Sequence, residues 1–303
     1  MQLSYLIKRN MKLFFKDKGM VISSLITPMI LILLYVTFLK NIYIDTFNQA
    51  ISQNNITIDE KYVNGFVYGW LFSSLLAVSC VTVSFCSNLL MVQDKVTGAI
   101  FDIQIAPVKK TKIAIAYYVA SMLVTMLIIL AEIIVGFIFL GIDGWFLTFS
   151  DVIAIIFSSF LLVNFGTALS SIIHHFLKTQ GQMSAVGTLI SSVYGFICGA
   201  YMPISQFGSG LQKVLSFLPG TYATTVIRYN YEAKVLEALK NECHLPTEVV
   251  EVMSKNFDIN IYFYDNLVSP LACYVILISS VLVFLGIYIL INFSRNKKQT
   301  KLI

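Results

Sequence analysis

The sequence has 303 residues, of which 57% are hydrophobic and 12% are charged, and its mean hydropathy is +0.78. A soluble domain carries about 25% charged residues, so the composition argues against a soluble protein and favours an integral membrane protein. The net charge of +5 comes from basic residues beside apolar runs rather than in aromatic-interleaved patches. This placement favours a membrane surface as the partner and argues against nucleic acid.

The N-terminal stretch 2–18 is amphipathic on a helical wheel. Its basic residues share one face and its leucines and isoleucines share the other, which predicts an interfacial helix over residues 1–19. The basic face consists of Lys8, Arg9, Lys12 and Lys16. A signal-peptide start is disfavoured, because the following apolar run is long enough for a full span and no small-x-small cleavage site follows it.

Six apolar stretches follow, and together they predict an all-α membrane domain over residues 20–303. The expected spans are about 20–39, 63–92, 113–140, 152–173, 183–202 and 267–293. Residues 203–219 are Gly- and Ser-rich and too short to cross, so they are expected to form a re-entrant or interfacial element before the sixth span. Within the polar stretch 221–265, residues 232–240 are compatible with a helix.

Six spans place both ends of the chain on one side of the membrane, and the charges indicate which side. The N-terminal arm, the links 93–112 and 174–182 and the C-terminal tail carry most of the basic residues. Their only acids are Asp17, Asp94 and Asp102. By the positive-inside rule, these parts and both termini are predicted to be cytoplasmic, and the segment 203–265 extracellular.

The link between the second and third spans, residues 93–112, is unusually structured. Asp94, Gly98, Asp102 and Pro107 punctuate it, and the apolar stretch between Gly98 and Pro107 is compatible with a helix. The sequence is compatible with two interpretations of this segment. The segment packs in a groove of a partner protein, or it is a plain amphipathic connector that lies on the membrane surface.

Residues that could carry chemistry are few. No phosphate-binding loop of the G-x-x-x-x-G-K-[ST] type occurs, so ATP-driven transport would need an ATPase on another chain. Glu132 is the only acid well inside a span, which makes it either a proton or substrate site or a structural carboxyl. His174 and His175 are adjacent and diverge on a helix, and the five cysteines form no even framework outside the membrane, so no metal site and no catalytic residues are predicted.

The chain resembles the permeases of the ABC-2 type transporter family, the membrane subunits of bacterial ABC exporters. The family shows an acid, a glycine four residues on and a proline nine after that between its second and third spans. The matching residues here are Asp94, Gly98 and Pro107. A further set of residues resembles one branch of the family, namely Asp102, Ala106-Pro107-Val108-Lys109 and Tyr117. Before the sixth span, Pro219, Tyr222 and Arg228 lie in a similar broken segment.

The resemblance implies a permease that pairs with a second permease copy, identical or different, and with two ABC ATPase subunits in the bacterial cytoplasmic membrane. This chain would bind no cofactor, since ATP and Mg would sit on the ATPases. The link 93–112 would be a cytoplasmic coupling helix and residues 2–18 a connecting helix. The coupling residues would be Asp94, Gly98, Ile100, Phe101, Asp102 and Pro107.

The expected function is therefore export of an amphipathic compound such as a drug, an antimicrobial peptide or a lipopeptide. Glu132, Tyr222 and Arg228 are the candidates for the transport path. Export of a lipid-linked glycan by the same mechanism is one alternative. An ion- or proton-coupled secondary transporter that uses Glu132 is another, although such proteins usually contain several buried ionisable residues and internal repeats.

Overall fold

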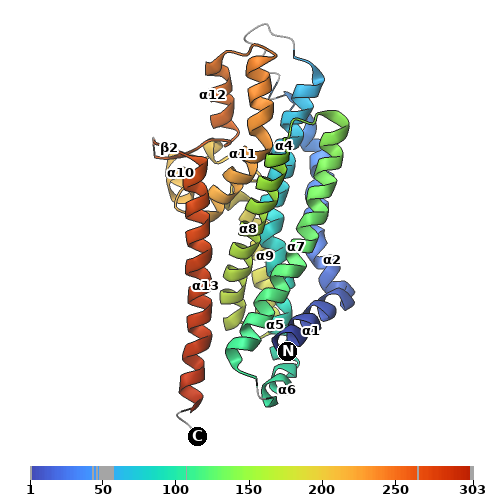
Figure 1. Cartoon of the computed structure of the whole chain (residues 1–303), viewed down its shortest axis with the longest axis vertical. Helices are drawn as coiled ribbons and strands as arrows, with labels where there is room; N and C mark the ends of the chain where they lie inside the picture. Colours follow the sequence, from blue (N-terminus) through green and yellow to red (C-terminus); the bar gives the residue numbers. More distant parts are fainter. Residues whose placement is uncertain are drawn as a thin grey trace.

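The computed structural model describes residues 2–42, 44, 45, 47, 58–106, 108–264 and 266–300, and most of these are helical. The elements are α1 (Gln2–Lys16), α2 (Lys18–Leu34), the π-helix η1 (Tyr35–Leu39), α4 (Glu60–Ser87), α5 (Leu89–Val96), α6 (Ala99–Ile105), α7 (Lys110–Asp143), α8 (Phe149–Phe176), α9 (Gln180–Ile197), the 3-10 helix η2 (Ile204–Gln206), α10 (Ser209–Leu215), α11 (Pro219–Asn241), α12 (Thr247–Asn256), β1 (Ile261–Phe263), β2 (Asn266–Val268) and α13 (Pro270–Thr300). They form an elongated bundle in which α1, α6 and the C-terminal end of α13 lie at the same end (Figure 1).

Four helical stretches of the described chain are long and apolar enough to cross a membrane. They are Glu60–Val96, Lys110–Asp143, Phe149–Phe176 and Pro270–Phe293. A fifth span is possible if α1 and α2 count as one broken helix, because they meet at a bend of 74°. The predicted all-α membrane class is therefore confirmed, but the six-span arrangement is not established. The expected span at 183–202 corresponds to α9, which has 18 residues and is not among the four.

Helix α4 is the centre of the bundle. It is buried along nearly its whole length, and it packs against α2, α7, α8, α9 and α11. Its sequence is apolar or small on all sides, which is the pattern of a helix enclosed by other helices. Gly166 on α8 allows a close approach, since an added Cβ would lie 3.0 Å from the carbonyl oxygen of Cys80 on α4.

The segment between α9 and α13 is more helical than the sequence predicts. Helix α11 begins at Pro219, well before the stretch 232–240 that was expected to be helical, and it packs against α4, α8 and α13. Its threonines bond within the chain, because the hydroxyl of Thr224 donates to the carbonyl of Gly220 at 3.0 Å. Such bonds let a polar sequence be buried. After α12, strands β1 and β2 form a short antiparallel hairpin with Ile261 opposite Val268. The re-entrant or interfacial element expected at 203–219 contains η2 and α10, and its entry into the membrane stays a prediction.

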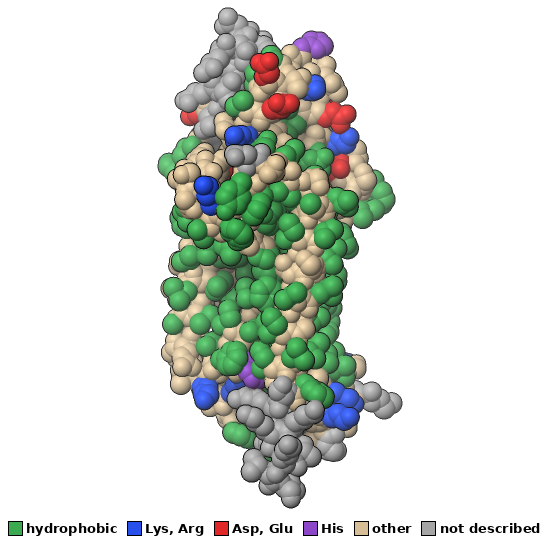
Figure 2. Space-filling view, turned by 90° about the vertical axis from the view of Figure 1, so that its left-hand side faces the viewer, with side chains coloured by type: hydrophobic (Ala, Val, Ile, Leu, Met, Phe, Trp, Pro, Cys, Tyr) green, Lys and Arg blue, Asp and Glu red, His purple; other side chains and the backbone are tan. Residues whose placement is uncertain are grey.

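The surface is divided along the long axis of the bundle. Figure 2 shows hydrophobic side chains over the middle of one face and charged side chains gathered toward the two ends. Helix α13 contributes exposed apolar residues along its length, including Leu271, Val275, Leu282 and Leu290. Exposed apolar surface of this extent is expected where lipid, rather than water, surrounds the protein.

Candidate functional site

A left-handed turn at Gly98 divides the link between α4 and α7. The turn separates α5 from α6, and the φ angle of Gly98 is 83°. A residue with a Cβ atom costs about 1–2 kcal/mol in this conformation, so the chain needs glycine here. The amide of Thr97 donates to the carbonyl of Gln93 at 2.9 Å and closes α5. The chain therefore changes direction at a fixed point, and α6 falls inside the stretch predicted to be helical.

Helix α6 exposes much of its apolar surface. Phe101 and Ile105 are 66% and 83% exposed, and Asp102 between them is also exposed. Ile100 and Ile103 face the other way and are partly buried. They contact a small cluster made of Leu90, Met91, Ile113 and Tyr117. The helix is thus held on the bundle by one side and presents two large apolar side chains and one acid on the other. Pro107 lies outside the described residues.

Asp94 joins three helices just before this turn. It lies near the end of α5, is 4% exposed and forms a two-pronged ion pair with Arg9 of α1. The Nη1 and Nη2 atoms of Arg9 donate to the two carboxylate oxygens at 2.5 and 3.0 Å. The hydroxyl of Tyr117 on α7 donates to the same carboxylate. A bidentate pair of this kind fixes both distance and orientation, so α1, α5 and α7 are tied at one point.

This arrangement changes the interpretation of the N-terminal basic face. Lys8, Lys12 and Lys16 are exposed on α1, where lipid headgroups can reach them. Arg9 instead turns its guanidinium toward Asp94. The sequence could not pair these two residues, because they are 85 positions apart. The resemblance pointed to Asp94 and to Tyr117 separately, and only the fold brings them together.

Lys95 makes a second tie that sequence reasoning missed. Its ammonium group donates to the carbonyls of His174 and His175 at 2.8 Å and to that of Leu177 at 3.3 Å. These carbonyls lie at the C-terminal end of α8. The last turn of a helix leaves carbonyl acceptors without intrahelical donors. Basic residues are favoured at such an end. The link between α4 and α7 is therefore attached to α8 as well as to α1 and α7.

Arg228, one of the three candidates for the transport path, is buried in a structural role. It is 1% exposed on α11, and its Nη2 atom donates to Ser74 on α4 and to the carbonyl of Gly199, both at 2.9 Å. Its guanidinium lies 4.7 Å from the ring centre of Trp70, and Asp258 approaches to 3.9 Å. Burial raises the pKa of the Asp258 carboxyl above its ordinary value, and the charge of Arg228 opposes that rise.

The other two path candidates lie in different surroundings. Tyr222 is 5% exposed, and its hydroxyl donates to the carbonyl of Ser216 at 2.5 Å in the turn before α11. Glu132 is 7% exposed on α7, and both of its carboxylate oxygens are buried without a hydrogen-bond partner among the described residues. Glu132 lies on α7, whereas Tyr222 and Arg228 lie on α11. Their role in a transport path stays a prediction.

Within the described ranges, no three His, Cys, Asp or Glu side chains are placed to hold a metal ion. His174 is fully buried, and its Nδ1 atom lies 2.7 Å from the carbonyl oxygen of Ser170. This contact orients the ring within α8. The neighbouring His175 is partly buried and lines a pocket described below.

The family model described as ABC-2 type transporter matches residues 1–231. This range includes α1, the Arg9–Asp94–Tyr117 cluster, α6 and most of α11. No curated protein matches the chain in sequence.

Proposed function

The chain belongs to the ABC-2 type transporter family, which makes it the membrane subunit of an ABC transporter, and we propose that it exports an amphipathic compound across the bacterial cytoplasmic membrane. A drug, an antimicrobial peptide or a lipopeptide is the proposed cargo. In this proposal, ATP and Mg bind to two separate ABC ATPase subunits, and a second permease copy completes the transport path. The basic residues at the end that carries α1 and α6 support a cytoplasmic location for that end.

The observation that carries this proposal is the two-sided character of α6. Its exposed side offers Phe101, Asp102 and Ile105, and its other side is held by the cluster beneath Ile100. Large aromatic and aliphatic side chains around a charge are typical of the anchors by which one protein docks in the groove of another. We assign this exposed side as the surface that contacts the ATPase.

The ties around α6 explain how a movement of the ATPase would reach the membrane helices. A displacement of α6 passes through the Gly98 turn to α5. From there the Arg9–Asp94 pair leads to α1, and Lys95 leads to the end of α8. Because these contacts fix orientation as well as distance, the helices respond as one body. Closure of two ATPases would then tilt the two permeases and open an outward path between them.

Glu132 supports the second candidate function, an ion- or proton-coupled transporter. A buried carboxyl with no hydrogen-bond partner among the described residues is costly and is a functional hypothesis in any membrane protein. Export of a lipid-linked glycan by the ATP-driven mechanism is a third candidate. It shares the coupling surface with the first and differs only in the cargo.

The test is purification of the tagged permease from its native membranes, with and without the substitution Phe101→Asp. We expect an ABC ATPase to co-purify with the unmodified chain and to be lost from the variant. Removing a central aromatic anchor typically costs 2 kcal/mol or more, which is about a thirtyfold loss of affinity. Val252→Asp is the matched control, because Val252 is 56% exposed on α12 at the opposite end of the bundle. An ATPase that binds both variants equally would refute the assignment of α6.

A further inference from the structure

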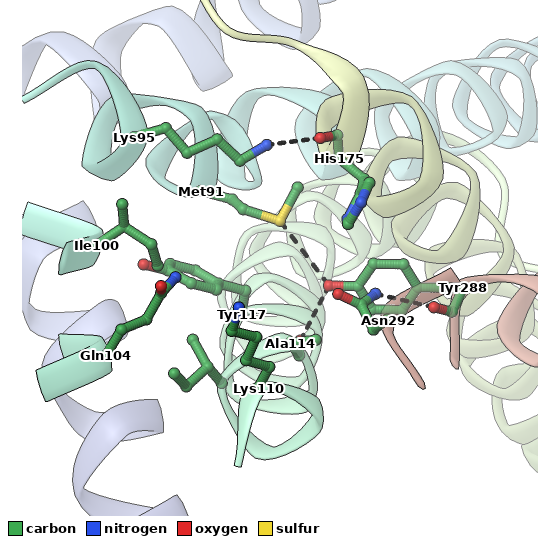
Figure 3. A pocket seen from close by; sticks show the side chains of 11 residues that line it. Met91, Lys95, Ile100, Gln104, Lys110, Ala114, Tyr117, His175, Tyr288 and Asn292 are labelled. Atoms are coloured by element: carbon green, nitrogen blue, oxygen red, sulfur yellow. Dashed lines mark hydrogen bonds between the residues drawn. The ribbon is translucent and has the colours of Figure 1, made fainter. Parts of the chain in front are cut away.

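A small pocket lies where five helices meet behind the coupling link (Figure 3). Its volume is about 130 Å³, and α5, α6, α7, α8 and α13 all contribute side chains. Lys95 and His175 lie on one side of the space in this view, and Lys110 lies on the other. Gln104, Tyr288 and Asn292 add polar groups around it. None of the described residues that line the pocket is acidic.

Several of these side chains are held in place by bonds within the bundle. The ammonium group of Lys95 donates to three backbone carbonyls at the C-terminal end of α8, so it adds positive charge to the pocket but no further hydrogen bond. The hydroxyl of Tyr288 donates to the carbonyl of Ala114 at 3.1 Å, and the amide of Asn292 donates to the carbonyl of Tyr288 at 2.8 Å. Among the described lining residues, basic and polar groups are concentrated without an acid, and such a concentration of positive charge favours the binding of an anion.

We propose that this pocket binds a phosphate-bearing anionic group, the headgroup of a lipid from the leaflet at the basic end of the bundle. The volume argues for a small group, because pockets for drug-sized molecules measure about 300–1,000 Å³. A cargo molecule of that size would not fit, whereas a phosphate fits with the rest of its lipid outside. This inference does not depend on ATP-driven export.

The position of the pocket favours a lipid as the source of the phosphate. Lys110 is the first residue of α7, and Asn292 lies one residue before the apolar part of α13 ends at Phe293. The pocket is therefore at the level where apolar helix surface gives way to basic residues, which is the level of lipid headgroups. Ile289 lies three residues before Asn292, on the same side of α13, and is 38% exposed. It gives an acyl chain an apolar surface beside the pocket.

An occupant would also connect the coupling link to the far side of the bundle. Ile100 and Gln104 belong to α6, whereas His175 belongs to α8 and Asn292 to α13. A phosphate that bonds to both sides would hold α6 against these helices. The lipid composition of the membrane would then influence how firmly α6 is positioned.

The test is native mass spectrometry of the intact chain in a neutral detergent, titrated with phosphatidylglycerol. We expect Lys110→Gln to raise the Kd for the first lipid about tenfold, the usual loss when a charged hydrogen bond is removed. Lys109→Gln and Lys112→Gln are matched controls, because each removes the same charge within two residues of Lys110, and neither lysine lines the pocket. An equal effect of all three substitutions, or no effect of Lys110→Gln, would overturn the proposal.

Two further measurements test the pocket with an uncharged substitution and distinguish a lipid from a free phosphate. Gln104→Leu removes a polar lining group from an exposed position without changing the charge. This substitution should also weaken the binding of the first lipid. It replaces Lys110→Gln as the test if Lys110→Gln lowers the yield of folded protein. Millimolar inorganic phosphate is then added to the lipid-bound chain. Retention of phosphatidylglycerol supports a lipid ligand, and its displacement would overturn the lipid assignment in favour of a free phosphate.

Discussion

Arg9 and Asp94 are 85 positions apart in the sequence, yet their side chains meet in a bidentate ion pair between α1 and α5. The carboxylate is 6% exposed and the guanidinium is 30% exposed, so the pair is only partly screened by solvent. We expect Asp94→Asn to destabilise the fold by about 1–3 kcal/mol, because it removes a charged acceptor that serves both Arg9 and Tyr117. Thermal unfolding of the purified chain in nanodiscs measures the loss.

A double-substitution cycle separates the ion pair from the other contacts of Asp94. Arg9→Gln alone should destabilise the fold, but in the Asp94→Asn background it should cost much less, since the partner is already lost. Lys12→Gln is the control, because Lys12 is exposed on the same helix. Additive effects of the Arg9 and Asp94 substitutions would show that the two residues do not act together.

The sequence predicted the membrane class and the short helix after Gly98 because long apolar runs and glycine turns are local signals. It did not predict the ties of Asp94 and Lys95, which join segments about 80 residues apart. A helical wheel and residue spacing describe only neighbouring positions, so neither can identify a contact between residues so far apart in the sequence. The basic residues of α1 are visible in the sequence, but the direction of the Arg9 side chain depends on where α5 lies.

Helix α11 shows a different limit of sequence reasoning. Its threonines, asparagines and arginine are typical of a polar loop. The hydrophobic residues of this segment show no helical periodicity. Their hydrogen bonds to carbonyls and to neighbouring helices make burial tolerable only in the folded bundle. One local signal was available, since Pro219 stands at the first position of the helix, where proline is favoured.

Gly98→Ala tests the turn that separates α5 from α6. An added Cβ would meet Phe101 only at 3.9 Å, so the cost comes from the φ angle of 83° and not from a clash. We expect the free energy of unfolding to fall by about 1–2 kcal/mol. We also expect the ATPase activity of the complex to respond more weakly to substrate. Gly98→Asn should be tolerated better, because asparagine adopts left-handed angles more readily than alanine.

The control for that prediction is Gly141→Ala. Gly141 lies inside α7, and an added Cβ there meets no atom within 4 Å. Because alanine favours a helix by about 1 kcal/mol over glycine, this variant should be as stable as the unmodified chain or more stable. If Gly98→Ala behaved in the same way, the left-handed turn would not be needed for coupling.

Glu132→Gln distinguishes ATP-driven export from proton coupling. An ionised carboxylate without partners would carry a large desolvation cost, and glutamine replaces it with an uncharged group of the same shape. We expect the variant to fold and to keep ATP-dependent transport at each pH between about 6 and 8. Loss of transport, or a changed pH profile in reconstituted vesicles, would favour the secondary transporter instead.

Arg228→Leu should be the most destabilising of these substitutions. It removes the donor to Ser74 and Gly199 and leaves the carboxylate of Asp258 buried without its nearest positive charge. Breaking a buried pair in this way costs about 3–5 kcal/mol. We expect a much lower Tm in differential scanning fluorimetry. Arg228→Lys should recover part of the loss by restoring the charge but not the planar fork.

The destabilisation by Arg228→Leu should also depend on pH. Burial raises the pKa of Asp258 and Arg228 lowers it, so removal of Arg228 raises that pKa further. An acid whose pKa is raised by folding favours the folded state below its unfolded pKa of about 4, and this benefit is lost as pH rises through the folded value. The Tm difference between Arg228→Leu and the unmodified chain should therefore be smaller at about pH 5 than at about pH 7.5. In the Asp258→Asn background this pH dependence should disappear, and its persistence there would assign it to another group.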